Sequence, residues 1–350
     1  MPTKQRLGVD IVGFGPIGRK LAELLARDDA LKRSFAVFSI SDSSSRVLPS
    51  KTSEVIKLID WKNSGRSLAD MRGIRKETGS DSNSSIVVDV TNSDYSRALD
   101  ARARALHAID SGKHFVSANK VALSNFFHEL FERARRKEVE IGFRATVAGG
   151  RYAISIIRGI DPGEVHSVSA LLNTSTTLIL SSLETDPAMT LDQACKNAAK
   201  AGMLESDWSI DLDGVDAAAK AAILSNAIFP KTKMSIKDVK RSGIRGEKAK
   251  KMIELGRTSH EKIRLVAELN SEGASVAPKA VKIDSPLAIS GRYNVVLLRT
   301  KTLGEISTRN LGGGAELTAS VIISDLKNIA ESRTASASPF PAISKRSMRE

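Results

Sequence analysis

Short apolar runs alternate with amphipathic segments along the first 145 or so residues. The runs are typical of strands, and the segments between them carry apolar side chains on one helical face, as Ile17, Leu21 and Leu24 do. Alternation of strands with helices predicts a parallel sheet with crossover helices, in an α/β fold. The Ser-rich stretch 42–85 predicts an irregular excursion. The predicted strands are 7–12, 35–40, 86–90, 114–117 and 138–143, and the predicted helices are 17–26, 98–109 and 125–136.

The pattern changes in the second half of the chain. Residues 165–265 are mostly helical in pattern, with the clearest predicted helices over 190–201 and 214–229. From 276 to 309 the pattern is extended, and a last helix over 317–330 follows the turn Gly312-Gly313-Gly314. This change predicts a second domain of α+β type. Its predicted strands are 281–283, 293–299 and 305–308.

At 350 residues the chain is long enough for two domains, and its composition, 41% hydrophobic and 27% charged, is that of globular proteins. No apolar run approaches the roughly 18 residues of a membrane-spanning helix. The N-terminus does not resemble a signal peptide, so we expect a cytoplasmic protein. The single cysteine, Cys195, excludes an internal disulfide and a cysteine-cluster metal site.

The formal net charge of +13 makes nucleic acid the first partner to consider. The charge is concentrated in 231–264, which holds twelve basic and four acidic residues, and in the tail 332–350. The first stretch has no aromatic side chain for stacking on bases, and we interpret it as a solvated helical face. Nucleic acid and membranes are therefore not expected partners, and the tail is expected to be flexible. The inward side of that face is expected to hold Ala249, Met252, Ile253 and Leu255.

A glycine-rich loop follows the first predicted strand and opens the first predicted helix. It has the spacing G-x-G-x-x-G, which allows a tight turn, close approach of a pyrophosphate to the backbone, and close packing of helix on strand. The phosphates then lie at the positive end of the helix dipole. The loop predicts a Rossmann-type dinucleotide-binding domain. Its residues are Gly13, Phe14, Gly15, Pro16, Ile17 and Gly18.

Two residues after the second predicted strand point to different cofactors. Asp42, about 24 residues after Gly18, is placed to bond a ribose hydroxyl and would favour NAD. Arg46 is placed to meet a 2′-phosphate and would favour NADP. The sequence therefore predicts use of NADP or NAD without choosing between them.

The segment from Glu205 to Lys220 holds the densest set of charged groups. Asp216 and Lys220 lie one turn apart on a predicted helix among apolar neighbours, so either a half-buried proton-transfer pair or an ordinary surface salt bridge fits the spacing. Lys120 follows the predicted strand 114–117, and the carboxyl ends of parallel strands form the ligand crevice of such sheets. Taken alone, Lys120 is also compatible with a solvated loop.

Together these features resemble the homoserine dehydrogenase family over residues 7–330. The motifs stand in the family's order, and residues 111–120 (SGKHFVSANK) are similar to the family's G-K-H-V-V-T-A-N-K. The resemblance implies a dinucleotide-binding domain, 1–145, completed by 310–331, and a catalytic and dimerisation domain, 146–309. It corresponds to the short, monofunctional form without an ACT domain. The other matching segments are Val88-Asp89-Val90-Thr91, Ala145-Thr146-Val147-Ala148-Gly149-Gly150, 205–220 and 312–325.

The resemblance implies an NAD(P)-dependent oxidoreductase that interconverts L-aspartate 4-semialdehyde and L-homoserine, in the biosynthesis of threonine, methionine and isoleucine. It implies that Lys220 transfers the proton, that Asp216 binds or orients the substrate, and that Lys120 adds a second positive charge. Glu205, helped by Asp211, is implied to bind the substrate amino group.

The resemblance also implies ligands around this centre. It implies a cofactor lined by Thr91, Gly202 and Gly314, and a homodimer formed through the extended segment 276–309. A sodium ion is implied on four backbone carbonyls, those of Arg144, Val147, Gly149 and Arg151.

Several positions depart from the family pattern. Thr174 replaces a glycine beside the nicotinamide, Leu178 replaces an aromatic residue, and Arg144 replaces a glutamate. Two alternatives therefore stay open. One is a related dehydrogenase for another small hydroxy or oxo amino acid. The other is a cofactor-sensing or nucleic-acid-binding protein that uses the basic stretches.

Overall fold

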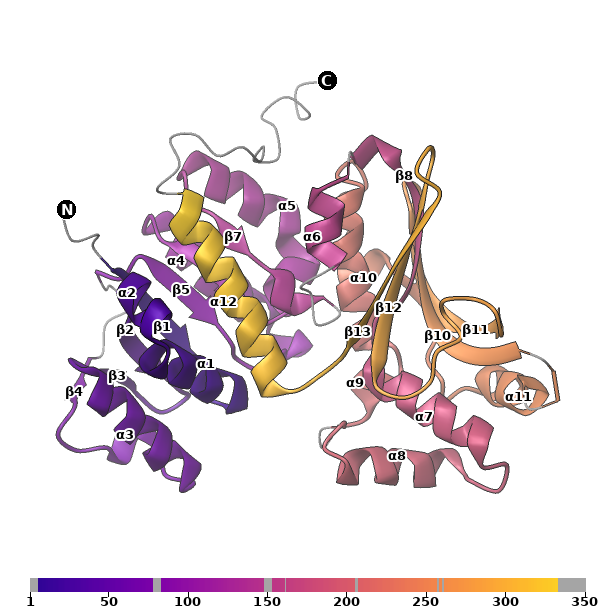
Figure 1. The fold of residues 1–350 in the computed structure, drawn as a ribbon, viewed down its shortest axis with the longest axis horizontal. Helices are drawn as coiled ribbons and strands as arrows, with labels where there is room; N and C mark the ends of the chain where they lie inside the picture. Colours follow the sequence, from indigo (N-terminus) through magenta and orange to yellow (C-terminus); the bar gives the residue numbers. More distant parts are fainter. Residues whose placement is uncertain are drawn as a thin grey trace.

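The structure is a computed structural model that describes residues 6–77, 83–147, 153–160, 162–204, 207–256, 258–259 and 261–332. Figure 1 shows two β-sheets side by side, each with its own helices, and a last helix that returns from the second sheet to the first. Among the described residues, no helix is both long and apolar enough to span a membrane.

The first sheet has seven strands in the order β4-β3-β2-β1-β5-β6-β7. The five strands from β2 to β7 run parallel, and β3 and β4 form an antiparallel edge. This is the doubly wound parallel sheet that the sequence predicts. The strands are β1 Leu7–Val12, β2 Phe35–Ser41, β3 Arg46–Leu48, β4 Arg75–Lys76, β5 Ile86–Asp89, β6 His114–Ser117 and β7 Ile141–Gly142.

Helices cover both faces of this sheet because successive strand residues point to opposite sides. Val116 of β6 belongs to the same buried core as residues of α1, α3 and α12, whereas the preceding Phe115 belongs to the core that includes residues of α4 and α5. Figure 1 shows α12, the last helix, lying beside α1 on one face. These helices are α1 Pro16–Arg27, α2 Asp29–Ser34, α3 Thr52–Asn63, α4 Ala98–Asp110, α5 Val121–Arg136 and α12 Ala315–Ser332.

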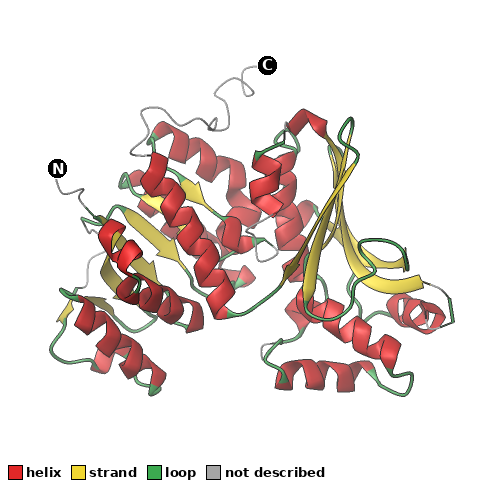
Figure 2. Ribbon diagram, viewed as in Figure 1, coloured by secondary structure: helices red, strands yellow, loops and turns green. Residues whose placement is uncertain are grey.

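The second sheet has six strands in the order β13-β12-β8-β10-β11-β9 and is antiparallel except for the pair β11–β9. Figure 2 shows its helices on the side of the sheet toward the first half and below it. The strands are β8 Val165–Leu171, β9 Lys240–Arg241, β10 Glu261–Asn270, β11 Gly273–Lys282, β12 Tyr293–Thr300 and β13 Glu305–Leu311. The helices are α6 Ala153–Arg158, α7 Thr174–Thr185, α8 Leu191–Lys200, α9 Ser209–Leu212, α10 Val215–Ile228 and α11 Glu247–Gly256.

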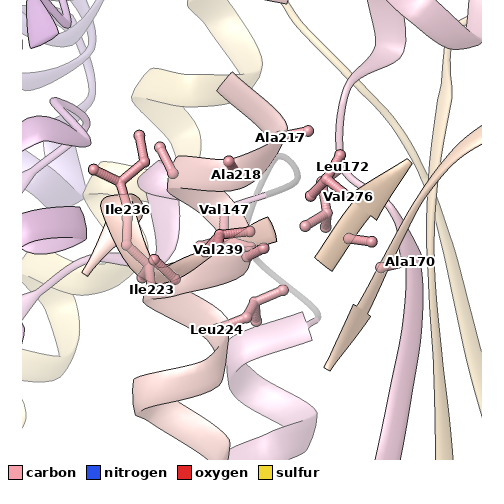
Figure 3. Packing of buried hydrophobic residues seen from close by; sticks show 14 of the residues in the cluster. Val147, Ala170, Leu172, Ala217, Ala218, Ile223, Leu224, Ile236, Val239 and Val276 are labelled. Carbon is pink, nitrogen blue, oxygen red and sulfur yellow. The ribbon is translucent and has the colours of Figure 1, made fainter. Parts of the chain in front are cut away.

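Helix α10 lies between the two sheets, and its environment is apolar on nearly all sides. It contacts α5 of the first half and β10 and β11 of the second. Figure 3 shows Ala217, Ala218 and Leu224 of α10 packed among buried residues that include Leu172 and Val276. The Ala-rich sequence allows the close approach on several faces that such a central helix requires.

Some sequence predictions need correction. The stretch 42–85 was expected to be irregular, but it contains α3 and two short edge strands. The buried face of α3 consists only of Val55, Leu58 and Ile59. Strands β8 and β10 lie in the stretch predicted to be mostly helical, and β7 is only two residues long. The expected inward Leu255 is exposed. The errors in helix and strand assignment arise where a short or amphipathic pattern fits both equally.

Candidate active site

The glycine-rich loop has the geometry that a dinucleotide phosphate requires. Gly13 has φ +101°, and a Cβ there would lie 2.8 Å from the Thr91 nitrogen, whereas a Cβ on Gly18 would lie 2.1 Å from the Gly13 oxygen. Beside Gly15 the space is open for 4 Å, and Gly15 caps α1 without a side-chain hydrogen bond. The first and third glycines therefore serve close packing, and the second leaves the helix N-terminus accessible, which fits a phosphate.

Asp42 directly follows β2, where the Gly13 N–H donates to the Ser41 carbonyl at 2.9 Å, and its carboxylate already has partners. Its carboxylate accepts hydrogen bonds from Ser44 and Ser45 and forms an ion pair of 2.5 Å with Lys62 of α3. Burial acts to raise the pKa of Asp42, but the bonds from Lys62 and Ser44 outweigh it and lower the pKa to about 2. The carboxylate is thus charged, and Lys62 is the cation beside it.

Arg46 faces the sheet instead. Its Nε donates to Ser39, and its guanidinium lies 3.6 Å from the buried Asp10 and 3.9 Å from Glu77.

The cation that the structure brings next to Asp42 is Lys62, which the sequence analysis did not single out. The missing signal is α3 itself, because Lys62 is one lysine among several in a stretch expected to be irregular.

Thr91 is the centre of a polar network at the carboxyl ends of β5 and β6. Its hydroxyl donates to the buried Asp89 at 2.6 Å and accepts hydrogen bonds from Asn119 at 2.8 Å and Arg104 at 3.2 Å. Asn119 in turn accepts from the backbone N–H of Val121, the first residue of α5. This network fixes the turn that carries Lys120.

Lys120 reaches the second half of the molecule at Asp216. Its Nζ lies 3.5 Å from one carboxylate oxygen of Asp216, and the Nζ of Lys220 lies 2.7 Å from the other. Lys220 also donates to the Leu172 carbonyl at 2.7 Å. Asp216 is only 9% exposed. Asp216 and Lys220 therefore form a buried cluster together with Lys120, and the interpretation of Asp216 and Lys220 as a surface salt bridge is wrong.

Asn173 joins the two aspartates. It caps α7, where its side-chain oxygen accepts the Thr176 N–H, and its amide nitrogen donates to Asp211 at 2.5 Å and to Asp216 at 2.9 Å. Its position before a helix with Thr at N1 was the available signal, since Asn is a favoured N-cap residue. The capping preference predicts the hydrogen bond from the Thr176 N–H, but it does not predict the hydrogen bonds from Asn173 to Asp211 and Asp216.

The two aspartates differ in pKa. Burial and the neighbouring charge of Asp216 raise the pKa of Asp211 to about 6. Burial also disfavours the charged form of Asp216, but Lys220 and Lys120 outweigh it, so its pKa is lowered. The site thus holds one permanently charged carboxylate between two lysines, and one carboxylate poised near neutral pH.

Comparison with known proteins identifies the family. A model of homoserine dehydrogenase matches residues 154–326, and a model of the homoserine dehydrogenase NAD-binding domain matches residues 13–144. The homoserine dehydrogenase of Methanocaldococcus jannaschii is 32% identical over 338 residues, which cover 92% of this chain and 98% of that protein. That of Pyrococcus horikoshii is 30% identical, with 92% and 96% covered.

The chain belongs to the homoserine dehydrogenase family. A hyperthermophilic archaeal homoserine dehydrogenase solved in complex with NADPH shares the fold at a TM-score of 0.81 and 29% identity, with 94% of this chain and 98% of that chain covered. The protein is thus an NAD(P)-dependent oxidoreductase acting on a CH–OH group, and its reaction interconverts L-aspartate 4-semialdehyde and L-homoserine in amino-acid biosynthesis.

Three further residues are implied by the homoserine dehydrogenase resemblance, and the structure describes two of them, Gly202 and Gly314. Gly202 has φ +69° in the turn after α8, and the methyl carbon of the neighbouring Met203 would lie 3.9 Å from a Cβ on Gly313. Gly314, with φ +93°, has open space beside it, so both glycines stand where a non-glycine residue would be strained. Glu205 lies outside the described residues.

The residues of the sodium site that the resemblance implies are described only in part. Val147 is fully buried, and the Nε of Arg144 lies 3.4 Å from Asp325 of α12. Gly149 and Arg151 lie outside the described residues. The geometry thus places the Arg144 guanidinium on α12, and a sodium ion stays a prediction.

Thr174, which replaces a family glycine, packs against the last glycine-rich turn. A Cβ on Gly312 would lie 2.1 Å from the Thr174 methyl carbon and 2.5 Å from the amide nitrogen of Asn294. The chain therefore accommodates the bulk of Thr174 by a glycine opposite it. Leu178, one turn later on α7, packs against the hydrophobic core.

Proposed function

We propose that Lys220 transfers the proton to and from the substrate oxygen in this homoserine dehydrogenase, and that Lys120 stabilises the developing alkoxide. The observation that carries the assignment is Asp216, a buried carboxylate held between one lysine from each half of the molecule. A positive charge aimed at a developing alkoxide in a water-poor site lowers the barrier, and a lysine beside it is a proton donor.

The cofactor and the residues of the proposed active site have separate roles in the reaction. When bound, NAD(P) supplies the hydride for reduction of the aldehyde and accepts it in the reverse direction. Asp216 holds the Nζ of Lys220 in place together with the Leu172 carbonyl. Asp211, which is charged above its pKa of about 6, binds the substrate ammonium with Glu205.

For the cofactor, we propose that the phosphates bind the loop of Gly13, Gly15 and Gly18, lined by Thr91, Gly202 and Gly314. The neutralisation of Asp42 by Lys62 supports NADP as the preferred form. A carboxylate engaged by a lysine and two loop N–H groups is a poor partner for ribose hydroxyls, and the lysine attracts a 2′-phosphate.

The test is oxidation of homoserine by the purified protein with each cofactor, alongside Lys220→Ala. We expect turnover with both cofactors in the unchanged protein, and a loss of at least about a hundredfold in kcat for the variant with cofactor binding retained. Lys250→Ala, an exposed lysine of α11, is the control. Turnover retained in Lys220→Ala would refute the role of Lys220.

A second candidate is a dehydrogenase for another small hydroxy amino acid. Thr174 supports it, because this residue follows directly after Asn173, the cap of α7 that bonds Asp211 and Asp216. The assay decides it when run on homoserine, serine and threonine at equal concentration. A higher kcat/KM for one of the others would establish it. Thr174→Gly would then shift kcat/KM toward homoserine.

Assembly and ions belong to the same proposal. We infer a homodimer through the second sheet, supported by Ile283, Leu303 and Leu311, large apolar residues exposed at its strand ends. Light scattering after gel filtration would measure the mass of the assembly.

A sodium requirement is tested by measuring initial rates with choline chloride in place of NaCl. A cytoplasmic location stays a prediction.

A further inference from the structure

The hydroxyl of Tyr95 is buried and has no hydrogen-bond partner among the described residues. Tyr95 begins a 3-10 helix, Tyr95–Arg97, in the loop after β5 that also carries Thr91. The residue as a whole is partly exposed, and its ring packs against the hydrophobic core that includes α10. A buried hydroxyl without a partner is destabilising, so its retention points to a partner that arrives with a ligand.

The charges around this hydroxyl are negative. Burial, together with the carboxylates of Asp216 and Asp211, raises the pKa of Tyr95 well above its usual value, so the phenol stays protonated. Asp216 is neutralised by two lysines, whereas Asp211 is bonded to Asn173 and forms no ion pair with a described residue. A small cation with several N–H donors suits a place near a phenol without a described hydrogen-bond partner and a carboxylate without a described ion pair.

We propose that Tyr95 binds the amino group of the amino-acid substrate: its phenol oxygen accepts one hydrogen bond from the ammonium while Asp211 accepts another. The inference rests on the proposed active site and adds a substrate-binding residue to it. A neutral acceptor satisfies a second N–H without adding a third negative charge beside Asp211 and Asp216. Because Tyr95 belongs to the first half and Asp211 to the second, the ammonium would join the two halves.

The experiment removes the two partners of this hydrogen bond separately. Tyr95→Phe removes only the hydroxyl, and 4-hydroxybutyrate is homoserine without the amino group. The KM for homoserine, kcat, the KM for NADP and the inhibition constant of 4-hydroxybutyrate against homoserine are measured for both enzymes. Tyr293→Phe is the matched control, since the Tyr293 ring lies under Arg309 in the second sheet and keeps that contact as phenylalanine.

For Tyr95→Phe we expect the KM for homoserine to rise about tenfold, the loss of one hydrogen bond to a charged group, with kcat and the KM for NADP within about twofold. The inhibition constant of 4-hydroxybutyrate should be unchanged, because this analogue has no ammonium to lose. Titration of homoserine into the enzyme–NADPH complex, followed by nicotinamide fluorescence, should show the same tenfold weakening without turnover.

Three results would overturn the proposal. If homoserine and 4-hydroxybutyrate weaken equally, the hydroxyl shapes the site and does not bind the ammonium. If neither weakens, Tyr95 does not contact the substrate. If the KM for NADP rises instead, the hydroxyl serves the cofactor. Failure of the proposed active site is seen separately, as turnover retained in Lys220→Ala.

Discussion

Asp211 and Asp216 show how neighbours decide what a side chain does. Both carboxylates are bonded to the amide nitrogen of Asn173, yet only Asp216 is paired with lysines. As a result the pKa of Asp216 is lowered, whereas burial and the charge of Asp216 raise that of Asp211 to about 6. The same residue type thus serves as a fixed charge at one position and as a titrating group at the other.

A pH dependence follows from Asp211. We predict that kcat/KM for homoserine falls as the pH is lowered through about 6, because protonation removes the charge that binds the substrate ammonium. Above that pH Asp211 is ionised and kcat/KM is at its plateau. Steady-state rates between pH 5 and 8 measure the step. Asp211→Asn should have a low kcat/KM without the step, and a step of equal size in this variant would contradict the assignment.

The proposed preference for NADP rests on Lys62, which pairs with Asp42. We predict that Lys62→Ala raises the KM for NADP about tenfold, since a contact with a charged phosphate is lost, and changes the KM for NAD by less than about threefold. Lys57→Ala, an exposed lysine on the same helix, is the control. Equal effects of Lys62→Ala on both cofactors would mean that Lys62 acts on the fold of the loop and not on the 2′-phosphate.

At the scale of elements, the site is built from the ends of helices. Gly15 caps α1 beside the phosphate loop, Lys120 precedes α5, Asn173 caps α7, and Gly214 caps α10 with φ +74°. Helix ends carry unpaired backbone groups and leave side chains free to point into a crevice. Asp216 is the second residue of α10, Lys220 lies one turn further along, and the alanines around them supply the packing.

Asn173 combines capping with orientation of the carboxylates. We predict that Asn173→Ala lowers the free energy of unfolding by about 1–2 kcal/mol, the loss of an N-cap, and lowers kcat about tenfold because Asp216 and Asp211 lose their shared donor. Thr190→Ala is the matched control, since Thr190 caps α8 away from these residues. It should lose similar stability in urea unfolding and keep kcat. A normal kcat in Asn173→Ala would show that the cap alone matters.

At the scale of the whole molecule, the proposed active site depends on how the two sheets meet. Lys120 follows a strand of the first sheet, and Asp216 lies on the helix packed between the sheets. Helix α12 then returns from the second sheet to pack on α1, and its Asp325 lies beside Arg144. One face of the first sheet is thus covered by α1 from the beginning of the described chain and by α12 from its end.

The second sheet is stabilised by a buried ion pair. Arg264 of β10 is fully buried, forms an ion pair with Glu184 of α7 and donates to the Ile289 carbonyl. We predict that Arg264→Ala lowers the free energy of unfolding by about 3–5 kcal/mol, because Glu184 loses its partner. Lys279→Ala, which breaks an exposed pair with Glu268 on the neighbouring strand, should cost less than about 1 kcal/mol. Equal losses in urea unfolding would contradict this account.

Arg264 also shows that the number of charged residues in a segment does not predict whether each of them is exposed. It belongs to the basic stretch 231–264, which was interpreted as a solvated helical face. Of that stretch only α11 is an α-helix among the described residues, and most of the other lysines and arginines are exposed. The prediction is wrong for Arg264 because a strand in the middle of a sheet has both faces covered. Alternation along 261–270 does not tell which polar residue is buried with a partner.

The sequence by itself determined the parallel sheet, the phosphate loop and the charged residues of the site, because strand and helix periodicity and the glycine spacing are local properties. Only the tertiary structure decided that Lys120 meets Asp216, that Lys62 pairs with Asp42, and that Asn173 joins two carboxylates. These contacts join segments far apart in the chain. Their strength, and the pKa of Asp211, depends on burial, which packing of the two sheets creates.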